Sequence, residues 1–322
     1  MRPGTMLPAT IHVIERGWLS SNNILFLEGN GDVAGAALID TGYAGQAQQT
    51  LTLVKEALNG RSLNRILNTH SHSDHIGGNA ALQAAHGCEI IVPDGIADMV
   101  ARWDEHALLL TPACQRGERF AHDATLKAGD EIELGGLPWK AIAAPGHDMH
   151  ALMLHCQTQR LLITGDALWE DGFGVVFNEL MAAELDAVTG ADVGGFAAAR
   201  KTLDAIQALD VLTVIPGHGS PFADVPGALL RAFSRLALYE QDKKRLGRNA
   251  VKACFTFNLL DFGRLAESEL ASYVASVPFF AQINHSLFGL SDTDFAQWLL
   301  DDLQRSRAVT IKDGWIVPLM AA

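Results

Sequence analysis

The chain has 322 residues, 48% of them hydrophobic and 19% charged, a balance that is typical of a globular protein with a sizeable core. Its formal charge of −13 argues against non-specific binding to nucleic acids or anionic membranes. There is no apolar run of about 18 residues, no leader-like N-terminus and no CxxC pair among four scattered cysteines, so a cytoplasmic protein with reduced thiols is expected.

Short strand-like runs and helical patterns alternate in the first part of the chain. Leu51, Val54 and Leu58 recur at helical spacing, and the turn Asn59-Gly60 ends that helix. A second helix ends at Gly87. The expected strands are 11–14, 24–27, 36–39, 65–68 and 89–92, the expected helices lie near 51–58 and 78–86, and residues 95–125 are expected to be helical and then loop-like.

A β pattern returns after Gly129, where Gly135-Gly136 marks a hairpin turn. The further expected elements are strands 131–134, 139–143, 151–156, 160–164 and 211–215, an irregular glycine-rich stretch over 166–196 and an amphipathic helix over 196–209. Because strands and helices alternate twice, residues 1–225 are expected to form one layered domain.

The composition changes near Pro226, and residues 226–322 are nearly neutral, with 11 basic and 10 acidic side chains. The spacing predicts one long helix over 229–246, shorter helices, a helix over 294–305 and strands 308–311 and 315–317. Asp313-Gly314 between the two strands is typical of a tight hairpin. These features predict a helical, winged-helix-like domain over 226–322, which covers the metal face of the first domain or forms a dimer contact.

The clearest chemical signal follows strand 65–68, where residues 69–78 read THSHSDHIGG. His70 and His72 point to one side if the chain is extended there, because strand side chains alternate. Asp74 and His75 fall where the chain turns into a helix. One short loop therefore offers ligands for two metals, and such a cluster is improbable as a mere solvated turn.

Three further ligand-type residues each follow a predicted strand: His147, Asp166 and His218. Each alone fits a turn or a packed histidine, but their order and placement with the first motif indicate a metal site. Nitrogen and oxygen donors suit zinc, which is expected first, and also iron or manganese. Two divalent ions about 3.5–4 Å apart lower the pKa of a water between them and polarise a carbonyl or phosphoryl oxygen.

Together these motifs resemble those of the metallo-β-lactamase-fold hydrolase superfamily over about residues 10–225. The resemblance implies an α+β fold, a four-layer αβ/βα sandwich with the metal site at one edge between the sheets, followed by a smaller, mainly helical domain. It implies that Asp40, in the run LIDTG, supports the site without being a ligand. The implied ligands are His70, His72 and His147 for one metal, Asp74, His75 and His218 for the second, and Asp166 bridging both, with a water or hydroxide between them; Asp74 and Asp166 are the implied catalytic residues.

Within the superfamily, the pair Asp74-His75 together with Asp166 resembles the dinuclear pattern of glyoxalase II, lactonases and ribonuclease-like members. The implied function is a dinuclear metal-dependent hydrolase that uses a metal-bridging hydroxide on an ester, thioester or lactone. The alternatives are a nuclease or RNA-binding hydrolase that uses the C-terminal domain, and a mononuclear iron persulfide dioxygenase. The basic and tyrosine residues with which glyoxalase II holds glutathione have no convincing match here, so a glutathione thioester is one candidate among several.

Other residues near these motifs have two interpretations each. His150 stands where the family has a small residue, and we interpret it as a rim residue rather than one that reaches the site. Trp169, Phe173 and Phe177 follow Asp166 and either line an apolar substrate pocket or pack as ordinary loop aromatics.

A basic cluster lies on the long helix expected in the C-terminal domain. It is interpreted as a solvated helix face rather than a contact for RNA or an anionic substrate. Its members are Lys243, Lys244, Arg245, Arg248 and Lys252. The expected partner is therefore a small-molecule substrate, with no nucleic acid and no membrane, and a homodimer is compatible with the sequence.

Overall fold

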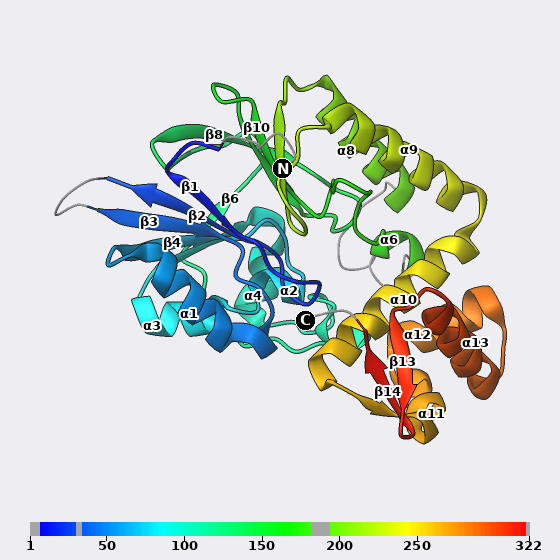
Figure 1. Ribbon diagram of the computed structural model, residues 1–322. Helices are drawn as coiled ribbons and strands as arrows, with labels where there is room; N and C mark the ends of the chain where they lie inside the picture. Colours follow the sequence, from blue (N-terminus) through cyan, green and yellow to red (C-terminus); the bar gives the residue numbers. More distant parts are fainter. Residues whose placement is uncertain (1–6, 30–33, 182–193, 320–322) are drawn as a thin grey trace.

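Two β-sheets pack face to face, and helices cover the outer side of each (Figure 1). The structure is a computed structural model that describes residues 7–29, 34–181 and 194–319. The four layers confirm the predicted αβ/βα sandwich. A mainly helical region follows it, and no helix within the described ranges combines the length and apolar character that a membrane crossing requires.

The first sheet has six strands in chain order. The pairs β1–β2 and β2–β3 are antiparallel, and the remaining three pairs, from β3 to β6, are parallel. Leu25 and Leu38 face its covering helices, whereas Phe26 and Ile39 face the second sheet, because side chains alternate along a strand. The strands are β1 (Ile11–Ile14), β2 (Asn23–Glu28), β3 (Gly35–Ile39), β4 (Ser62–Leu67), β5 (Glu89–Pro93) and β6 (Ala124–Leu126).

Helices α1 (Ala47–Leu58) and α3 (Asn79–His86) cover the outer face of this sheet. They end as predicted, with Asn59 and Gly87 in the left-handed conformation that closes a helix. The region 95–125 is only partly as predicted: it contains α4 (Ala97–Arg102) and α5 (Leu110–Ala113), but also the strand β6. That strand was missed because it has three residues and no fully buried side chain.

The second sheet has five strands in the order β11-β10-β9-β8-β7, antiparallel except for the pair β10 and β11. Its inner face meets the first sheet, and its outer face lies under α8 (Gly195–Ala208) and α9 (Val225–Gln241). The predicted strands are confirmed. They are β7 (Glu131–Leu134), β8 (Leu137–Ala143), β9 (Leu152–Cys156), β10 (Leu161–Gly165) and β11 (Thr213–Pro216).

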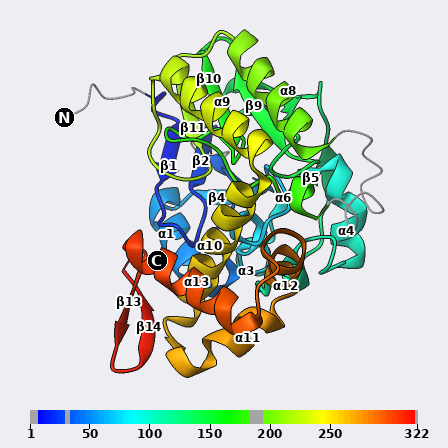
Figure 2. The ribbon, with the colours of Figure 1, turned by 90° about the vertical axis from the view of Figure 1, so that its right-hand side faces the viewer.

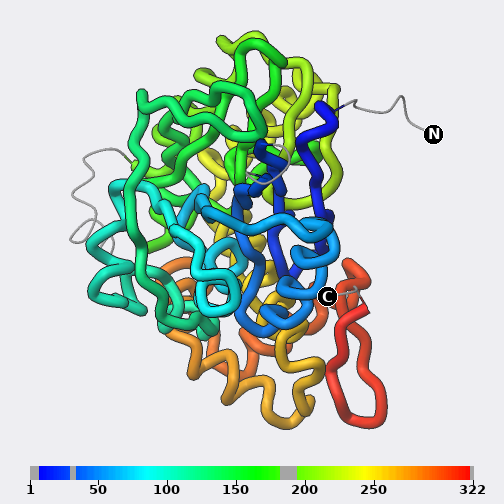
Figure 3. Tube along the Cα trace, turned by 90° about the vertical axis from the view of Figure 1, so that its left-hand side faces the viewer, coloured from blue at the N-terminus to red at the C-terminus, as the bar shows by residue number. Residues whose placement is uncertain are grey.

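After α9, the described part of the C-terminal region contains four further α-helices and a three-stranded antiparallel sheet, and its terminal hairpin projects from the body of the molecule (Figure 3). Asp313 and Gly314 both have positive φ between the paired residues Lys312 and Trp315, which confirms the predicted tight hairpin. The helices are α10 (Lys243–Phe262), α11 (Leu270–Ser276), α12 (Pro278–Ile283) and α13 (Asp292–Arg305), and the strands are β12 (Leu265–Ala266), β13 (Val309–Lys312) and β14 (Trp315–Pro318).

The prediction of a single long helix over residues 229–246 is wrong. The chain forms two helices, α9 and α10, with an extended residue, Asp242, between them. The Asp242 carboxylate accepts a hydrogen bond from the backbone N–H of Lys244 and so caps α10. The apolar spacing continues through this junction and therefore gave no sign of the break.

The helix α10 descends from the end of α9 toward the smaller helices and the hairpin (Figure 2). One apolar cluster extends from Met153 and Leu162 of the second sheet, through α8 and α9, to Phe255 of α10 and Leu299 of α13. The C-terminal region therefore shares its core with the sandwich.

Candidate metal centre

All seven predicted ligand residues lie at one edge of the sandwich, in loops that directly follow strands. His70, His72, Asp74 and His75 follow β4, with the last two in the short helix α2 (Ser73–Ile76). The other three residues follow β8, β10 and β11; they are His147, Asp166 and His218. The structure thus brings all the predicted site residues together, in two adjoining groups.

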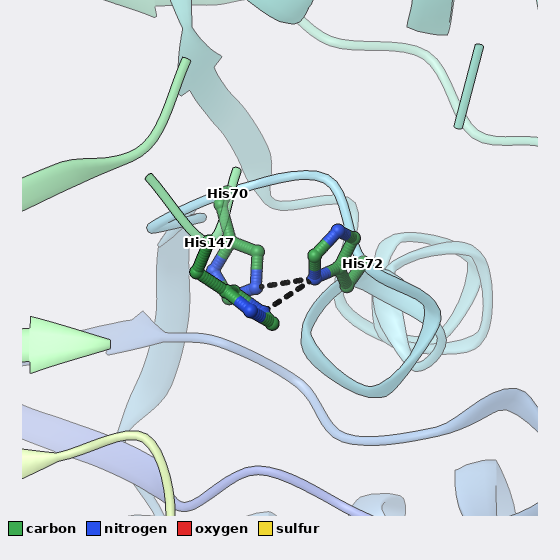
Figure 4. A group of neighbouring side chains, drawn as sticks. All are labelled: His70, His72 and His147. Atoms are coloured by element: carbon green, nitrogen blue, oxygen red, sulfur yellow. Dashed lines mark hydrogen bonds between the residues drawn. The ribbon is translucent and has the colours of Figure 1, made fainter. Parts of the chain in front are cut away.

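The first group consists of three imidazoles whose ring nitrogens face one another (Figure 4). His72 Nδ1 lies 3.1 Å from His70 Nε2 and 2.7 Å from His147 Nε2. His147 Nδ1 is 2.6 Å from the carbonyl oxygen of Val175, and a donor there leaves Nε2 with a free lone pair. A cation between the three nitrogens would satisfy all of them, and three imidazoles are a common protein ligand set for zinc.

The second group consists of two histidines and two carboxylates: Asp74, His75, Asp166 and His218. His218 Nε2 lies 2.9 Å from Asp74 Oδ2, and His75 Nε2 lies 3.4 Å from Asp166 Oδ1. His75 Nε2 is buried, yet it makes no hydrogen bond to any described residue. A buried nitrogen of this kind, aimed at two carboxylates, fits a metal ligand.

Asp166 contacts both groups. Its Oδ1 faces His75, and its Oδ2 lies 3.4 Å from His147 Nε2 in the first group. The indole N–H of Trp169 donates to Oδ1 at 3.2 Å and so fixes the carboxylate from the outer side. The position suits a ligand shared by two metals.

Asp40 holds the second group from behind. Its carboxylate accepts hydrogen bonds from the backbone N–H and the hydroxyl of Thr69, both at 2.8 Å, and lies 2.7 Å from His75 Nδ1. A donor at Nδ1 directs His75 Nε2 into the site. Asp40 lies in neither donor group, in agreement with the supporting role that the resemblance implies.

Asp148 supports the first group from outside the donor set, a role that the sequence analysis did not predict. The buried carboxylate accepts hydrogen bonds from the backbone N–H of Ser71 at 3.1 Å and from its hydroxyl at 2.6 Å. Ser71 stands between His70 and His72, so Asp148 ties their loop to the loop of His147. The available signal was an acidic residue directly after a predicted ligand.

His150 lies outside both donor groups. Its backbone N–H donates to Asp148 Oδ1 at 2.7 Å, and its ring lines a small cavity of about 30 Å³ behind His72 and His147. This placement fits a residue at the margin of the site.

The electrostatics of the site match its donor set. Burial, assisted by the neighbouring imidazoles, holds the pKa of His70 well below its usual value and lowers that of His72 to about 4, so both are neutral. Burial would raise the pKa of Asp166, but His75, His218 and His147 outweigh it and hold this pKa well below its usual range. Burial likewise would lower the pKa of His75, but Asp166, Asp40 and Asp74 raise it well above normal. The negative field that favours a proton on His75 would equally favour a divalent cation.

Members of both groups line a cavity of about 290 Å³: His72 and His147 of the first, and Asp74, Asp166 and His218 of the second. Phe177 packs on the His72 ring, with the ring centroids 5.1 Å apart, and Trp169 packs on His218 at 5.5 Å. Phe173 also lines the cavity, so all three aromatic side chains expected after Asp166 lie at this cavity, although Phe173 and Phe177 also pack in the core of the second sheet. One face of α10 provides a further wall.

The basic cluster on α10 is largely compensated by carboxylates. Lys243 pairs with Glu179, Arg245 with Asp242, and both Arg248 and Lys252 with Asp302.

Residues 17–218 match the sequence profile of the metallo-beta-lactamase superfamily. The hydroxyacylglutathione hydrolase of Hyphomonas neptunium is 34% identical over 120 residues, which are 37% of this chain and 40% of that protein. The hydroxyacylglutathione hydrolase of Methylococcus capsulatus is 31% identical over 169 residues, which are 52% of this chain and 56% of that protein. The chain spans about half the length of the curated relatives that it matches.

Solved structures share the fold at lower identity. A metallo-beta-lactamase family protein from Thermus thermophilus aligns with a TM-score of 0.54 and 19% identity over 97% of this chain and 100% of that chain. The FEZ-1 metallo-beta-lactamase from Legionella gormanii aligns with a TM-score of 0.56 and 14% identity over 74% of this chain and 94% of that chain.

Proposed function

We propose that this chain, which belongs to the metallo-beta-lactamase superfamily, is a hydrolase that binds two divalent metal ions and cleaves an ester, thioester or lactone. The observation that carries the proposal is the convergence of seven donor residues, in two adjoining groups, at a largely apolar cavity. The relatives named hydroxyacylglutathione hydrolase support a carbonyl-centred hydrolysis over the same region of the chain.

In this proposal His70 Nε2, His72 Nδ1 and His147 Nε2 hold one ion, and Asp74, His75 and His218 hold the other, with Asp166 shared. The donor set suits zinc first, and iron or manganese as alternatives. When bound, two such ions supply a polarised carbonyl oxygen and a water of lowered pKa.

The protein's own residues orient the ligand side chains and exclude bulk water. Asp40 sets the tautomer of His75, and Val175 sets that of His147, so that each presents Nε2 to the site. Asp74 and Asp166 are proposed as the catalytic residues, because both line the cavity and their carboxylates can accept hydrogen bonds from an attacking water. Trp169 and the other aromatic side chains exclude bulk water from the reacting carbonyl.

The cavity wall favours a small apolar substrate over glutathione. Among the described residues that line the cavity there is no tyrosine, and the basic ones are Arg235 and Lys252. We further propose that residues 1–225 supply the metal centre and that residues 226–322 cover it and complete the wall. Because the charges of the basic cluster are compensated, nucleic acid is not proposed as a substrate.

Metal analysis and a hydrolysis panel test the proposal. Protein purified without chelator is expected to carry two metal equivalents per chain and to hydrolyse thioesters, esters or lactones, with no turnover of phosphodiesters. One equivalent at full activity would contradict the dinuclear assignment. Oxygen uptake with a glutathione persulfide, with no hydrolysis, would show the mononuclear iron alternative to be correct.

A further inference from the structure

One face of α10 lines the cavity beside the metal centre. Its cavity residues are Asn249, Lys252, Ala253, Cys254, Thr256 and Phe257, and all except Cys254 recur at spacings of three and four, as one face of a helix requires. Asn249 is exposed and Phe257 is buried, so the stripe leads inward from the surface. At the helical rise, the stripe is about 12 Å long.

The wall that faces the cavity from the loop after Asp166 is apolar and held in place. Phe173, Val175 and Phe177 contribute side chains, and two arginines of α9 fix the preceding turn. Arg231 Nε donates to the carbonyl oxygen of Glu170 at 2.8 Å, and Arg235 donates to that of Asp171 at 2.6 Å. A wall held in this way is formed before a ligand arrives, which lowers the entropy lost on binding.

The charged residues of the described lining are Asp74 and Asp166 at the metal centre, Arg235 of α9, and Lys252 of α10, which pairs with Asp302. Most of the other lining residues are apolar. Cys254 and Thr256 of α10 are buried, and burial raises the pKa of the Cys254 thiol to about 12, so that it stays neutral. A polar or peptide-like ligand arm would lose its hydrogen bonds to water along this apolar lining.

We infer that the cavity selects substrates in which an apolar arm adjoins the scissile ester or thioester, and that Ala253 sets the size of that arm. The inference rests on the proposed function and names the substrate class of the same site. Ala253 is small and half-buried, and it stands in the middle of the α10 stripe, so a larger side chain there projects into the cavity. The aromatic walls, Trp18 and Phe177 among them, supply the apolar contact that holds the arm.

A homologous series of thioesters tests the inference. N-acetylcysteamine thioesters of acetic, butyric, hexanoic and octanoic acid differ only in the length of the arm. For the metal-loaded protein, kcat/KM is expected to rise about fourfold per methylene until the cavity is filled. Substitutions Ala253→Val, Ala253→Leu and Ala253→Phe are expected to shorten the preferred chain in that order, with Ala253→Leu lowering the octanoyl-to-acetyl ratio of kcat/KM at least about tenfold.

The matched control is Ala281→Leu, the same change on an exposed face of α12 outside the cavity lining, which is expected to keep the chain-length profile. Circular dichroism and urea unfolding identify any variant that fails to fold, and the smallest substitution, Ala253→Val, then carries the comparison.

Binding provides a readout that does not depend on turnover. Trp18 and Trp169 line the cavity, so octanoate is expected to change the intrinsic fluorescence saturably, and Ala253→Phe is expected to weaken this binding at least about tenfold. Binding of octanoate without hydrolysis of any carbonyl substrate would overturn the proposed function and keep the apolar site. Hydrolysis with equal kcat/KM for acetyl and octanoyl thioesters, unchanged by Ala253→Leu, would overturn the inference and keep the proposed function.

Discussion

The metal centre and the cavity wall lie side by side, but the chain builds them in opposite ways. The seven donor residues come from four short loops, each directly after a strand of the sandwich. The wall combines residues as distant in sequence as Trp18, the loop after Asp166, α10 and Ala308. Reactive groups are thus positioned by local strand ends, whereas substrate fit depends on how the C-terminal region packs against the sandwich.

Removing the C-terminal region is expected to have the largest effect on solubility and turnover, because it removes most of one cavity wall and leaves the metal loops in place. Deletion of residues 226–322 removes α9 from the outer face of the second sheet, where Leu162 and Val214 lie, and removes the α10 wall of the cavity. The shortened chain is expected to be insoluble, or soluble and inactive. Solubility and turnover of the expressed fragment measure this, and a soluble fragment with full activity would show that the wall is dispensable.

The substitution Asp166→Asn acts on the metal centre alone. The amide keeps the shape of the side chain but removes the charge that faces both donor groups. We expect the loss of one metal equivalent and a fall in turnover of about a hundredfold or more, with the fold intact. Metal content and turnover of the purified variant test this expectation.

Asp148→Asn is the matched control for that substitution. Asp148 is also buried, but it bonds Ser71 and lies in neither donor group. The variant is expected to bind both metals at saturation, with affinity at the three-histidine group weakened about tenfold because the loop is held less firmly. If Asp148 proved indispensable for metal and Asp166 did not, the assignment of the ligands would be wrong.

The substitution Asp302→Asn acts on the wall and spares the metal centre. The carboxylate is buried. Hydrogen bonds from Arg248 lower its pKa most, burial opposes this effect, and Lys252 lowers the pKa further. A carboxylate whose pKa is lowered in the folded protein stabilises it above the unfolded pKa of about 3.9, and this stabilisation disappears as the pH falls through the folded pKa.

At pH 7, Asp302→Asn is therefore expected to lower the free energy of unfolding by about 2 kcal/mol, with two bound metals retained. Urea unfolding of wild type and variant at pH 7 and at pH 3 measures the difference, which should shrink at the lower pH. The exposed neighbour Asp301 offers a control, since Asp301→Asn is expected to change stability little. An equal loss of unfolding free energy in both variants would show that Asp302 has no special role in stability.

Local patterns made the individual strands and the first ligand motif predictable, whereas the four-layer sandwich and the grouping of the seven donors were implied by the resemblance to the superfamily. The strand 131–134 was predicted at its observed bounds, and the motif from His70 to His75 carries four donors within six residues. The break at Asp242 was not predictable from apolar spacing, because a capping aspartate in an amphipathic run reads as an exposed helical position. The α10 stripe was missed for a related reason: its mixture of polar, small and aromatic residues gains meaning only once the helix is packed against the loop after Asp166.

The cavity is lined by residues from both the sandwich and the C-terminal region, and this has a thermodynamic consequence. A ligand that fits between Trp18 and Ala308 binds only when the sandwich and the C-terminal helices are both folded and docked. By mass action, such a ligand at 100 times its Kd adds about 2.7 kcal/mol to the stability of that docked state, and nothing to a state in which the two regions have separated. Substrate therefore links the two regions, so that ligand-bound protein unfolds more cooperatively than the free chain.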